Sequence, residues 1–334
     1  MVRLSPFDWR FRLMAVKRRI KRNASGDVMT WGECVNEFLE EKSSALSKST
    51  VDGYEYAISV FQQFHHIEDD MDINELTQSH FFKWINWMKN EKTSTHTIKH
   101  YIGSVRVFIY WCMDHEYIKE PFEIKMIEVQ EARPKVYEDE ELDALLEKPK
   151  RNATFGEWRC YAITNFIMAT GARASTITNM KISDLNFAKR EIYYTHTKTK
   201  IAQTVPMSSS LETVLREYIK IWRSNIADGW LFCNVGEEKL TVNALHTSFA
   251  KYCANRGVKG HSIHQLRHSF SREWIRNNGN VFALQQMLGH TTLDMSRKYV
   301  RLYANDLKQG FDAYSPLDNI KKNSKRTQVV KRSK

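Results

Sequence analysis

The sequence predicts a mainly helical protein with one small β-sheet, an α+β chain organised in two domains. Its 334 residues suit two domains of ordinary size. Apolar residues recur at three- and four-residue spacing over residues 28–118 and again from residue 138 onward, which is typical of amphipathic helices. A single pair of short β-prone segments, 190–195 and 202–206, interrupts the second helical region.

Residues 28–118 predict a helical domain because no alternating strand pattern runs through them. The apolar residues that carry the helical period are Leu39, Tyr54, Ile58, Phe61, Phe64, Phe82, Trp84, Ile85 and Met88. Thr50 and Thr97 each precede an amphipathic run, and a hydroxyl side chain is a preferred helix N-cap, so we expect helices to begin there. Residues 119–137 hold two prolines and little periodicity and are predicted to be a linker.

Residues 138–316 predict a second domain of mixed structure. Acidic residues from Glu138 onward favour a helix start, and an apolar helix over 158–170 should end at Gly171. The two β-prone segments predict a hairpin with a basic tip. Further helices are expected over 211–224, 241–256, 264–277, 281–288 and about 294–303.

The net charge of +11 is concentrated at the two ends of the chain. Residues 1–27 carry eight Lys or Arg against two Asp, and residues 317–334 carry seven against one. The 289 residues between them are almost neutral, with 35 basic and 36 acidic side chains. Basic segments gain affinity for nucleic acid by releasing counterions from phosphate, so we interpret them as a basic N-terminal extension and a basic C-terminal tail for a polyanionic partner.

Other features narrow the class of protein. The five cysteines are scattered and never in C-x-x-C spacing, which favours reduced thiols and a cytoplasmic location over a disulfide framework. The basic N-terminus lacks an apolar core and a cleavage site of the signal-peptide type, and no apolar run reaches the ~18 residues of a membrane span.

The stretch Ser262–Phe270, SIHQLRHSF, has two chemical interpretations. It approaches the zinc-peptidase pattern H-E-x-x-H, but Gln265 occupies the glutamate position and cannot act as the general base, so we expect no metal. His264 and Arg267 instead share a helix face at i and i+3, and a guanidinium fork fits two phosphate oxygens. His261 and His268 are expected to be structural histidines.

Four more residues follow a recognisable order around this pair. Arg173 comes just after Gly171, Lys198 lies in the predicted hairpin tip, His290 follows Leu288-Gly289, and Tyr299 comes nine residues later. The order Arg…Lys…His-x-x-Arg…Gly-His…Tyr resembles that of the tyrosine recombinases, the phage-type integrase and Xer superfamily. The resemblance covers about residues 30–310 and implies a helical, SAM-like core-binding domain over 28–118 and a tyrosine-recombinase catalytic domain over 138–316.

The resemblance also implies a role for each residue. Tyr299 would attack the scissile phosphate of DNA to form a 3′-phosphotyrosyl link, with His264 accepting the phenol proton. Arg173 and Arg267 would hold the non-bridging oxygens and His290 would donate to the same phosphate. Lys198 would protonate the leaving 5′-oxygen. No metal, ATP or other cofactor is required by this scheme.

Some positions keep alternatives or depart from the family pattern. Lys200 lies two residues after Lys198 and could replace it, and Tyr303 lies one turn after Tyr299. Thr176 occupies a position where many members carry glutamate, which puts the support of Arg173 in doubt. Only some 28 residues precede the core-binding region, fewer than the arm-site domain of larger integrases needs. Lys48, Lys99 and Arg106 are candidate DNA contacts.

The resemblance implies a site-specific recombinase that acts as a homotetramer on duplex DNA, with accessory DNA-bending or directionality proteins as possible partners. Residues 307–320 would dock on a neighbouring protomer. Compact size and basic tails favour a mobile-element integrase or transposase, and the alternative is an Xer-type enzyme of chromosome-dimer resolution. Rival classes are a type IB topoisomerase, a catalytically silent DNA-binding protein and a zinc hydrolase.

Overall fold

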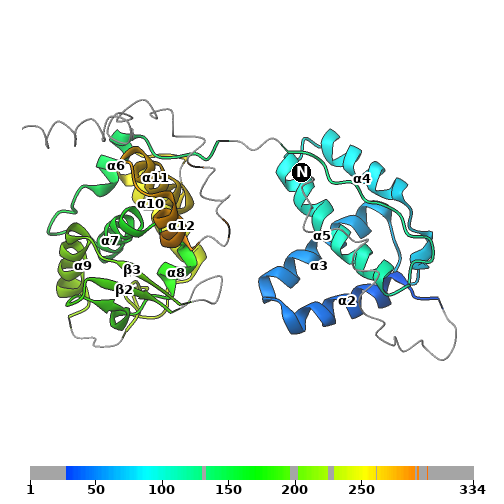
Figure 1. Cartoon of the computed structure of the whole chain (residues 1–334), viewed down its shortest axis with the longest axis horizontal. Coiled ribbons are helices and arrows are strands. Elements are labelled where there is room, and N and C mark those ends of the chain that lie inside the picture. Colours follow the sequence, from blue (N-terminus) through cyan, green and yellow to red (C-terminus); the bar gives the residue numbers. More distant parts are fainter. Residues whose placement is uncertain are drawn as a thin grey trace, which may run out of the picture. The chain divides into compact units, whose positions relative to one another are not determined.

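The computed structural model describes residues 28–129, 133–195, 202–224, 229–260 and 262–289, together with Thr292 and Tyr299. Two compact units divide the chain between residues 131 and 132 (Figure 1). Both units are mainly helical, and the second contains a small antiparallel sheet. None of the described helices is both long enough and apolar enough to cross a lipid bilayer.

The N-terminal unit is built from four α-helices and one 3₁₀ turn in its described part. They are α2 (Trp31–Ala45), α3 (Lys48–His65), η1 (Ile73–Glu75), α4 (Gln78–Asn90) and α5 (Thr95–Asp114). Helices α3 and α5 pack closely along each other, and aromatic side chains fill the space between the elements. The ring of Trp31 lies edge-on to Phe108 at 5.3 Å and stacks on Phe61 at 6.0 Å, so the core of this unit is rich in aromatic contacts.

Two details of this unit differ from the sequence predictions. Ser47 and Ser94 are the N-caps of α3 and α5, three residues before the predicted Thr50 and Thr97. In each S-x-x-T segment the serine takes the cap position and the threonine falls in the first turn; Ser94 Oγ accepts a hydrogen bond from the backbone N–H of Thr97 at 3.1 Å. Phe82, predicted to lie on the buried face, is 50% exposed because its neighbour Phe81 occupies that face of α4.

The segment predicted as a linker, 119–137, is docked at both of its ends. Ile124 is buried in the N-terminal core, and its backbone N–H donates to the hydroxyl of Tyr110 at 3.1 Å. Tyr137 is fully buried in the core of the second unit. The described parts of this segment therefore contribute side chains to both cores.

His65 makes the stability of the N-terminal unit depend on pH. Its Nε2 lies 3.0 Å from the backbone oxygen of His80, and burial, with the positive charges of His80 and Lys83, lowers the pKa of His65 to about 4. Between about pH 6.5 and pH 4 the unfolded chain binds the proton that the folded chain excludes, so stability is lost as pH falls through this window. We predict that the free energy of unfolding, measured by urea denaturation, falls less over this pH window in His65→Gln, whose amide can still donate to His80. An equal fall of the free energy of unfolding with pH in both proteins would contradict the assignment to His65.

The C-terminal unit surrounds the central helix α7 (Phe155–Thr170). The other described helices of this unit are α6 (Asp139–Leu146), α8 (Ala174–Thr178), η2 (Ile182–Asp184), α9 (Ser209–Trp222), α10 (Val242–Asn255), α11 (Ile263–Arg276) and α12 (Val281–Leu288). Helix α7 is buried on all sides and packs against α6, α9, α10 and α11. Its C-cap, Gly171, has φ +65°, a left-handed conformation that glycine adopts without steric cost.

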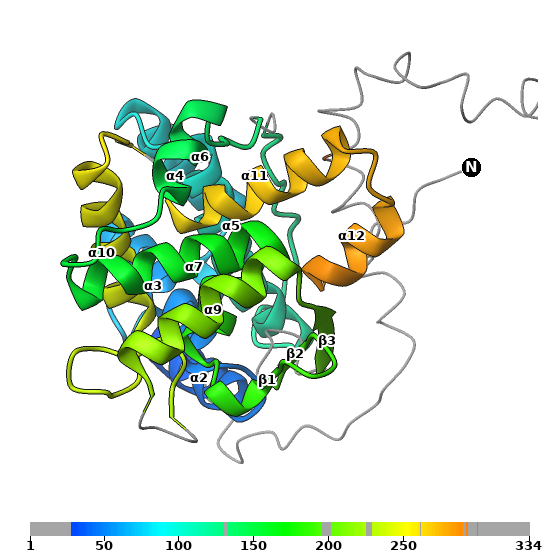
Figure 2. The same ribbon diagram turned by 90° about the vertical axis from the view of Figure 1, so that its left-hand side faces the viewer.

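The sheet lies at one edge of the C-terminal unit, beside the end of α12 (Figure 2). Strands β1 (Leu185–Asn186), β2 (Glu191–Tyr194) and β3 (Gln203–Pro206) pair antiparallel in the order β1-β2-β3, with Ile192 opposite Val205. The predicted hairpin is confirmed in β2 and β3, whereas β1 was not predicted because two residues carry no period. The predicted hairpin tip and, except for Tyr299, the predicted helix over 294–303 lie outside the described residues.

Candidate active site

Arg267 forms hydrogen bonds with the ends of two helices at the candidate site. It lies on α11 and is only 4% exposed. Its Nη1 donates to the backbone oxygen of Gly171 at 2.5 Å, and its Nη2 donates to that of Leu288 at 2.9 Å. Burial, followed by the neighbouring charge of Arg173, lowers the pKa of Arg267 to about 10, so the guanidinium is still charged at neutral pH. The forked side chain is thus held by the C-terminal ends of α7 and α12.

Arg173 approaches the same place from the start of α8. It is the N-cap residue of this short helix, and its Nη2 lies 3.4 Å from the backbone oxygen of Gly289, at the end of α12. The side chain is half-buried, and burial lowers its pKa. Thr176, at the position where many family members carry glutamate, is buried at 5% exposure in α8. Two guanidinium groups therefore converge where α7 and α12 end.

The phenol of Tyr299 is the third group of the candidate site. The side chain is 5% exposed and belongs to the core of the C-terminal unit. Its hydroxyl lies close enough to Arg173 and Arg267 that an ionised phenolate would raise the pKa of both. The same hydroxyl lies 2.7 Å from Nδ1 of His268. The predicted nucleophile is thus within electrostatic reach of both predicted phosphate-binding arginines of the same chain.

His264 lies one turn before His268 on the same face of α11. The two imidazole rings meet edge-to-face with centroids 4.5 Å apart. His264 keeps an exposed surface, yet partial burial, together with the charges of Arg267 and Arg173, lowers its pKa. It is therefore a neutral imidazole at neutral pH, next to the arginines that would hold an anion.

Sequence reasoning missed the position of His268. The residue was expected to be structural, but its imidazole contacts the hydroxyl of Tyr299. A signal was available, because residues i and i+4 share a helix face and His268 follows His264 at that spacing. His261, the other histidine expected to be structural, lies outside the described residues.

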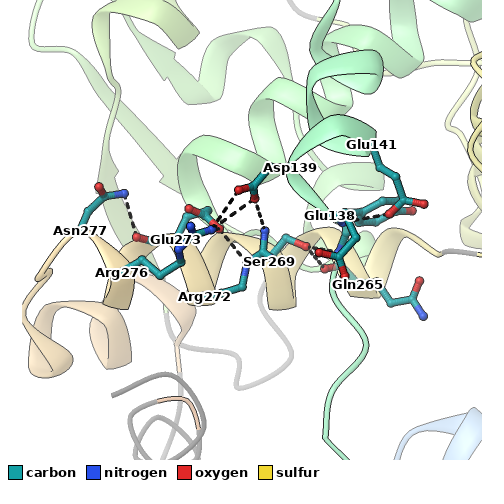
Figure 3. A network of polar contacts seen from close by, with 10 residues as sticks. Glu138, Asp139, Glu141, Gln265, Ser269, Arg272, Glu273, Arg276 and Asn277 are labelled. Carbon is teal, nitrogen blue, oxygen red and sulfur yellow. Dashed lines mark hydrogen bonds and ion pairs between the residues drawn. The ribbon is translucent and has the colours of Figure 1, made fainter. Parts of the chain in front are cut away.

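A network of polar contacts fixes α6 and the preceding chain to α11 (Figure 3). Asp139 accepts hydrogen bonds from Arg272 at 2.9 Å and from Arg276 at 3.2 Å, both on α11. The backbone N–H of Tyr137 donates to the hydroxyl of Ser269 at 2.8 Å. These contacts hold the chain that enters from the N-terminal unit against the helix that carries the site residues.

The root of the β2–β3 hairpin is also tied to the site. Gln203, the first residue of β3, donates through its side-chain amide to the backbone oxygens of Gln286 and, at 3.2 Å, Met287. Gly289 follows directly and has φ +57°, and a Cβ added there would lie 3.1 Å from the Gln203 side chain. The strand leaving the predicted basic tip therefore begins at the end of α12, beside Arg173.

Gly171 offers a direct test of how tightly this region is packed. A Cβ at this position would lie 2.6 Å from Phe270 and 2.7 Å from Leu288, in addition to the strain of a positive φ. We predict that Gly171→Ala lowers the free energy of unfolding by about 2–5 kcal/mol, since left-handed backbone costs ~1–2 and overpacking ~1–3 kcal/mol. Gly257→Ala is the matched control, because φ there is +76° but nothing lies within 4 Å of the added Cβ. Urea denaturation should show a clearly smaller loss for the control, and equal losses would contradict the packing argument.

The structure describes only some of the predicted site residues. Lys198 and His290, with the alternatives Lys200 and Tyr303, lie outside the described residues. In the N-terminal unit, Lys48 and Lys99 are exposed near the starts of α3 and α5. Arg106 is half-buried, with its guanidinium 4.8 Å from the centre of the Tyr110 ring. Their proposed contact with DNA stays a prediction.

Gln265, which occupies the glutamate position of the zinc-peptidase pattern, is part of a helix cap. Its side-chain oxygen accepts a hydrogen bond from the backbone N–H of Ser262 at 2.8 Å, so Gln265 completes a capping box at the start of α11. Among the described residues, no group of three or more His, Cys, Asp or Glu side chains is placed to hold a metal ion.

Comparison with known proteins assigns the family. The phage integrase family matches residues 135–306, and the phage integrase N-terminal SAM-like domain matches residues 35–116. The chain belongs to the phage integrase family. More particularly, its relatives are tyrosine recombinases, so it is a member of this class of site-specific DNA recombinase.

Two curated relatives show the extent of the similarity. Tyrosine recombinase XerC of Roseiflexus castenholzii is 24% identical over 280 residues, which cover 81% of this chain and 89% of the relative. Tyrosine recombinase XerA of Pyrococcus furiosus is 24% identical over 294 residues, which cover 85% and 96%. The aligned part thus covers more than four-fifths of this chain and most of each relative.

Solved structures share the fold. The Tn1549 transposon integrase in complex with a circular intermediate DNA has a TM-score of 0.68 at 17% identity, covering 81% of this chain and 95% of that one. A lambda integrase tetramer bound to a Holliday junction has a TM-score of 0.65 at 15% identity, covering 82% and 78%. The helical fold with a small sheet is therefore confirmed.

Proposed function

We propose that this recombinase breaks and rejoins two specific duplex DNA sites through a covalent link to Tyr299. The observation that carries the proposal is that the guanidinium groups of Arg173 and Arg267 converge at the ends of α7 and α12, within electrostatic reach of the Tyr299 hydroxyl. Two fixed positive charges next to a phenol suit a phosphodiester, because phosphoryl transfer depends mainly on positioning and charge stabilisation.

In the first step the phenol oxygen of Tyr299 bonds to phosphorus and the bond to the 5′-oxygen breaks. The products are a 3′-phosphotyrosyl link and a 5′-hydroxyl end. A free phenol has a pKa of ~10, so an imidazole on α11 takes its proton as attack proceeds. Arg173 and Arg267 hold the non-bridging oxygens, His290 donates to the same phosphate, and Lys198 protonates the leaving oxygen. The ester conserves the energy of the broken bond, so rejoining needs no ATP and no metal.

The proposed substrate and assembly are based on what the related structures contain. The Tn1549 integrase and lambda integrase structures contain DNA, and one of them is a tetramer on a Holliday junction. We propose duplex DNA as the partner of this chain, a homotetramer as its active assembly and the cytoplasm as its location. Lys48, Lys99 and Arg106 contribute DNA contacts from the N-terminal unit, and residues 307–320 dock on the next protomer.

The proposal is tested with a suicide duplex, nicked so that the strand beyond the cleavage site diffuses away after attack. A covalent protein–DNA adduct in EDTA, with a free 5′-hydroxyl on the released strand, is the expected result. Cleavage that needs a divalent metal and leaves no adduct would overturn the proposal, as would DNA binding with no cleavage at all.

Within this class we propose a mobile-element integrase or transposase, on the basis of the compact size and the basic ends of the chain. The curated XerC and XerA relatives favour the second candidate, an Xer-type recombinase of chromosome-dimer resolution. Mapping the covalent adducts on genomic DNA separates them. Adducts at the ends of an excisable element support the first, and adducts at one chromosomal site without such an element support the second.

A further inference from the structure

The end of α12 offers backbone oxygens to groups outside the helix. The last carbonyl groups of an α-helix have no N–H donor one turn further on, so side chains, water or neighbouring backbone must satisfy them. At this end the backbone oxygens of four consecutive residues, 286–289, each accept a hydrogen bond from a side chain. Arg267 donates to Leu288 at 2.9 Å and Arg173 donates to Gly289 at 3.4 Å. Both predicted phosphate-binding arginines are therefore held by the same helix end.

A third side chain, that of Gln203, binds the same helix end. Its Nε2 carries two hydrogens and donates to the backbone oxygens of Gln286 and, at 3.2 Å, Met287. Gln203 is the first residue of β3, and this strand lies beside the end of α12 (Figure 2). A Cβ built on Gly289 would lie 3.1 Å from Oε1 of Gln203 and 3.6 Å from Nη1 of Arg173. The amide and the guanidinium thus flank the same glycine.

The neighbouring strand also brings a side chain to the arginines. Tyr194 of β2 pairs directly with Gln203, so the two side chains lie on the same face of the sheet. Tyr194 is 4% exposed, and its hydroxyl lies within electrostatic reach of Arg267. Thr204, the next residue of β3, is exposed, because successive side chains of a strand point to opposite faces. The face of the sheet that carries Gln203 therefore borders the arginines, and Thr204 points away from that face.

We propose that Gln203 is a positioning residue of strand cleavage, which fixes the end of α12 and, through it, the guanidinium groups of Arg173 and Arg267. The inference rests on the proposed function, in which these arginines hold the non-bridging oxygens of the phosphate. Without the amide, the helix end loses its hydrogen bonds to the sheet, and the backbone oxygens of Leu288 and Gly289 shift relative to the guanidinium groups. A displacement of about 1 Å at a reacting group can lower the rate by ~10²-fold.

Arg173 depends on this helix end more than Arg267 does. Arg267 also donates to the backbone oxygen of Gly171, at the end of α7. Among the described residues, Gly289 is the hydrogen-bond partner of Arg173, and 3.4 Å is long for such a bond. The loss of the Gln203 amide should therefore act mainly through Arg173. Residues that act through one another give non-additive effects, so a double-variant cycle tests this link.

Gln203→Leu keeps the approximate size of the side chain and removes both donor hydrogens. At saturating suicide duplex, we expect single-turnover cleavage to slow by about 10- to 100-fold while the affinity for DNA is unchanged. Thr204→Val is the matched control, because it alters the same strand on the opposite face, and it should cleave at the unsubstituted rate. Gln203→Met is measured in parallel, with thermal unfolding recorded for each variant, so that one poorly folded protein does not decide the result.

A cycle with Arg173→Lys separates positioning from a general loss of structure. If Gln203 acts through Arg173, adding Gln203→Leu to Arg173→Lys should slow cleavage much less than it slows the unsubstituted protein. Effects that multiply fully would overturn the proposal, as would cleavage by Gln203→Leu at the rate of Thr204→Val. An adduct in the unsubstituted protein that depends on Tyr299 would leave the proposed function standing even then. Its absence would overturn the proposed function, and this inference with it.

Discussion

Tyr299→Phe is expected to abolish the covalent protein–DNA adduct while leaving the fold and DNA binding intact. The change removes one oxygen and keeps the ring, which is packed in the core of the C-terminal unit. The lost hydrogen bond to the half-buried His268 should cost only about 0.5–1.5 kcal/mol of stability. No adduct should form on the suicide duplex, because the phenol oxygen is the atom that would bond to phosphorus.

Tyr303→Phe is the matched control for this prediction. Tyr303 lies one helical turn after Tyr299 in the sequence pattern and is the alternative nucleophile. Denaturing gel electrophoresis of the cleavage reaction should show the adduct in Tyr303→Phe and none in Tyr299→Phe. An adduct in Tyr299→Phe and none in Tyr303→Phe would identify Tyr303 as the nucleophile. An adduct in both single variants would show that neither tyrosine is the only nucleophile.

The local sequence predicted the secondary structure well where apolar residues recur at helical spacing or where a capping residue ends a helix. Helix α12 matches its predicted bounds, 281–288, and α7 ends at Gly171 as predicted, because a glycine in a left-handed conformation terminates it. The S-x-x-T segments show the limit of this reasoning. Both hydroxyl residues are acceptable caps, and the first one of each pair takes the position in α3 and α5.

The candidate site was predictable as a list of residues but not as a geometry. Arg173 and Arg267 are 94 positions apart, and nothing in the spacing says that their guanidinium groups meet at the ends of α7 and α12. Only the resemblance to a known family predicted that both arginines bind the same phosphate. The contact between His268 and Tyr299 is similarly a tertiary feature, since the sequence gives the helix face of His268 but not the element that covers it.

Arg267→Lys should lower cleavage strongly although it keeps the positive charge. The guanidinium fork donates to the backbone oxygens of Gly171 and Leu288 at once, and an ammonium on a flexible stem cannot reproduce that planar geometry. One buried carbonyl would then lose its partner, at a cost of about 1–3 kcal/mol in the free energy of unfolding. We expect single-turnover cleavage to fall by about 10²–10³-fold, the usual effect of removing one fixed donor to a developing anion.

Arg276→Lys provides the comparison on the same helix. Arg276 is 45% exposed and pairs with Asp139 and Glu273 near the end of α11, so a lysine there keeps a solvent-screened ion pair that is worth at most ~1 kcal/mol. Urea denaturation and adduct formation are measured on both variants at a temperature where each is folded. Arg276→Lys should match the unsubstituted protein in both measurements. If Arg267→Lys cleaved as fast as Arg276→Lys, the guanidinium at position 267 would be a structural tie between α7, α11 and α12, and the phosphate would need a different anchor.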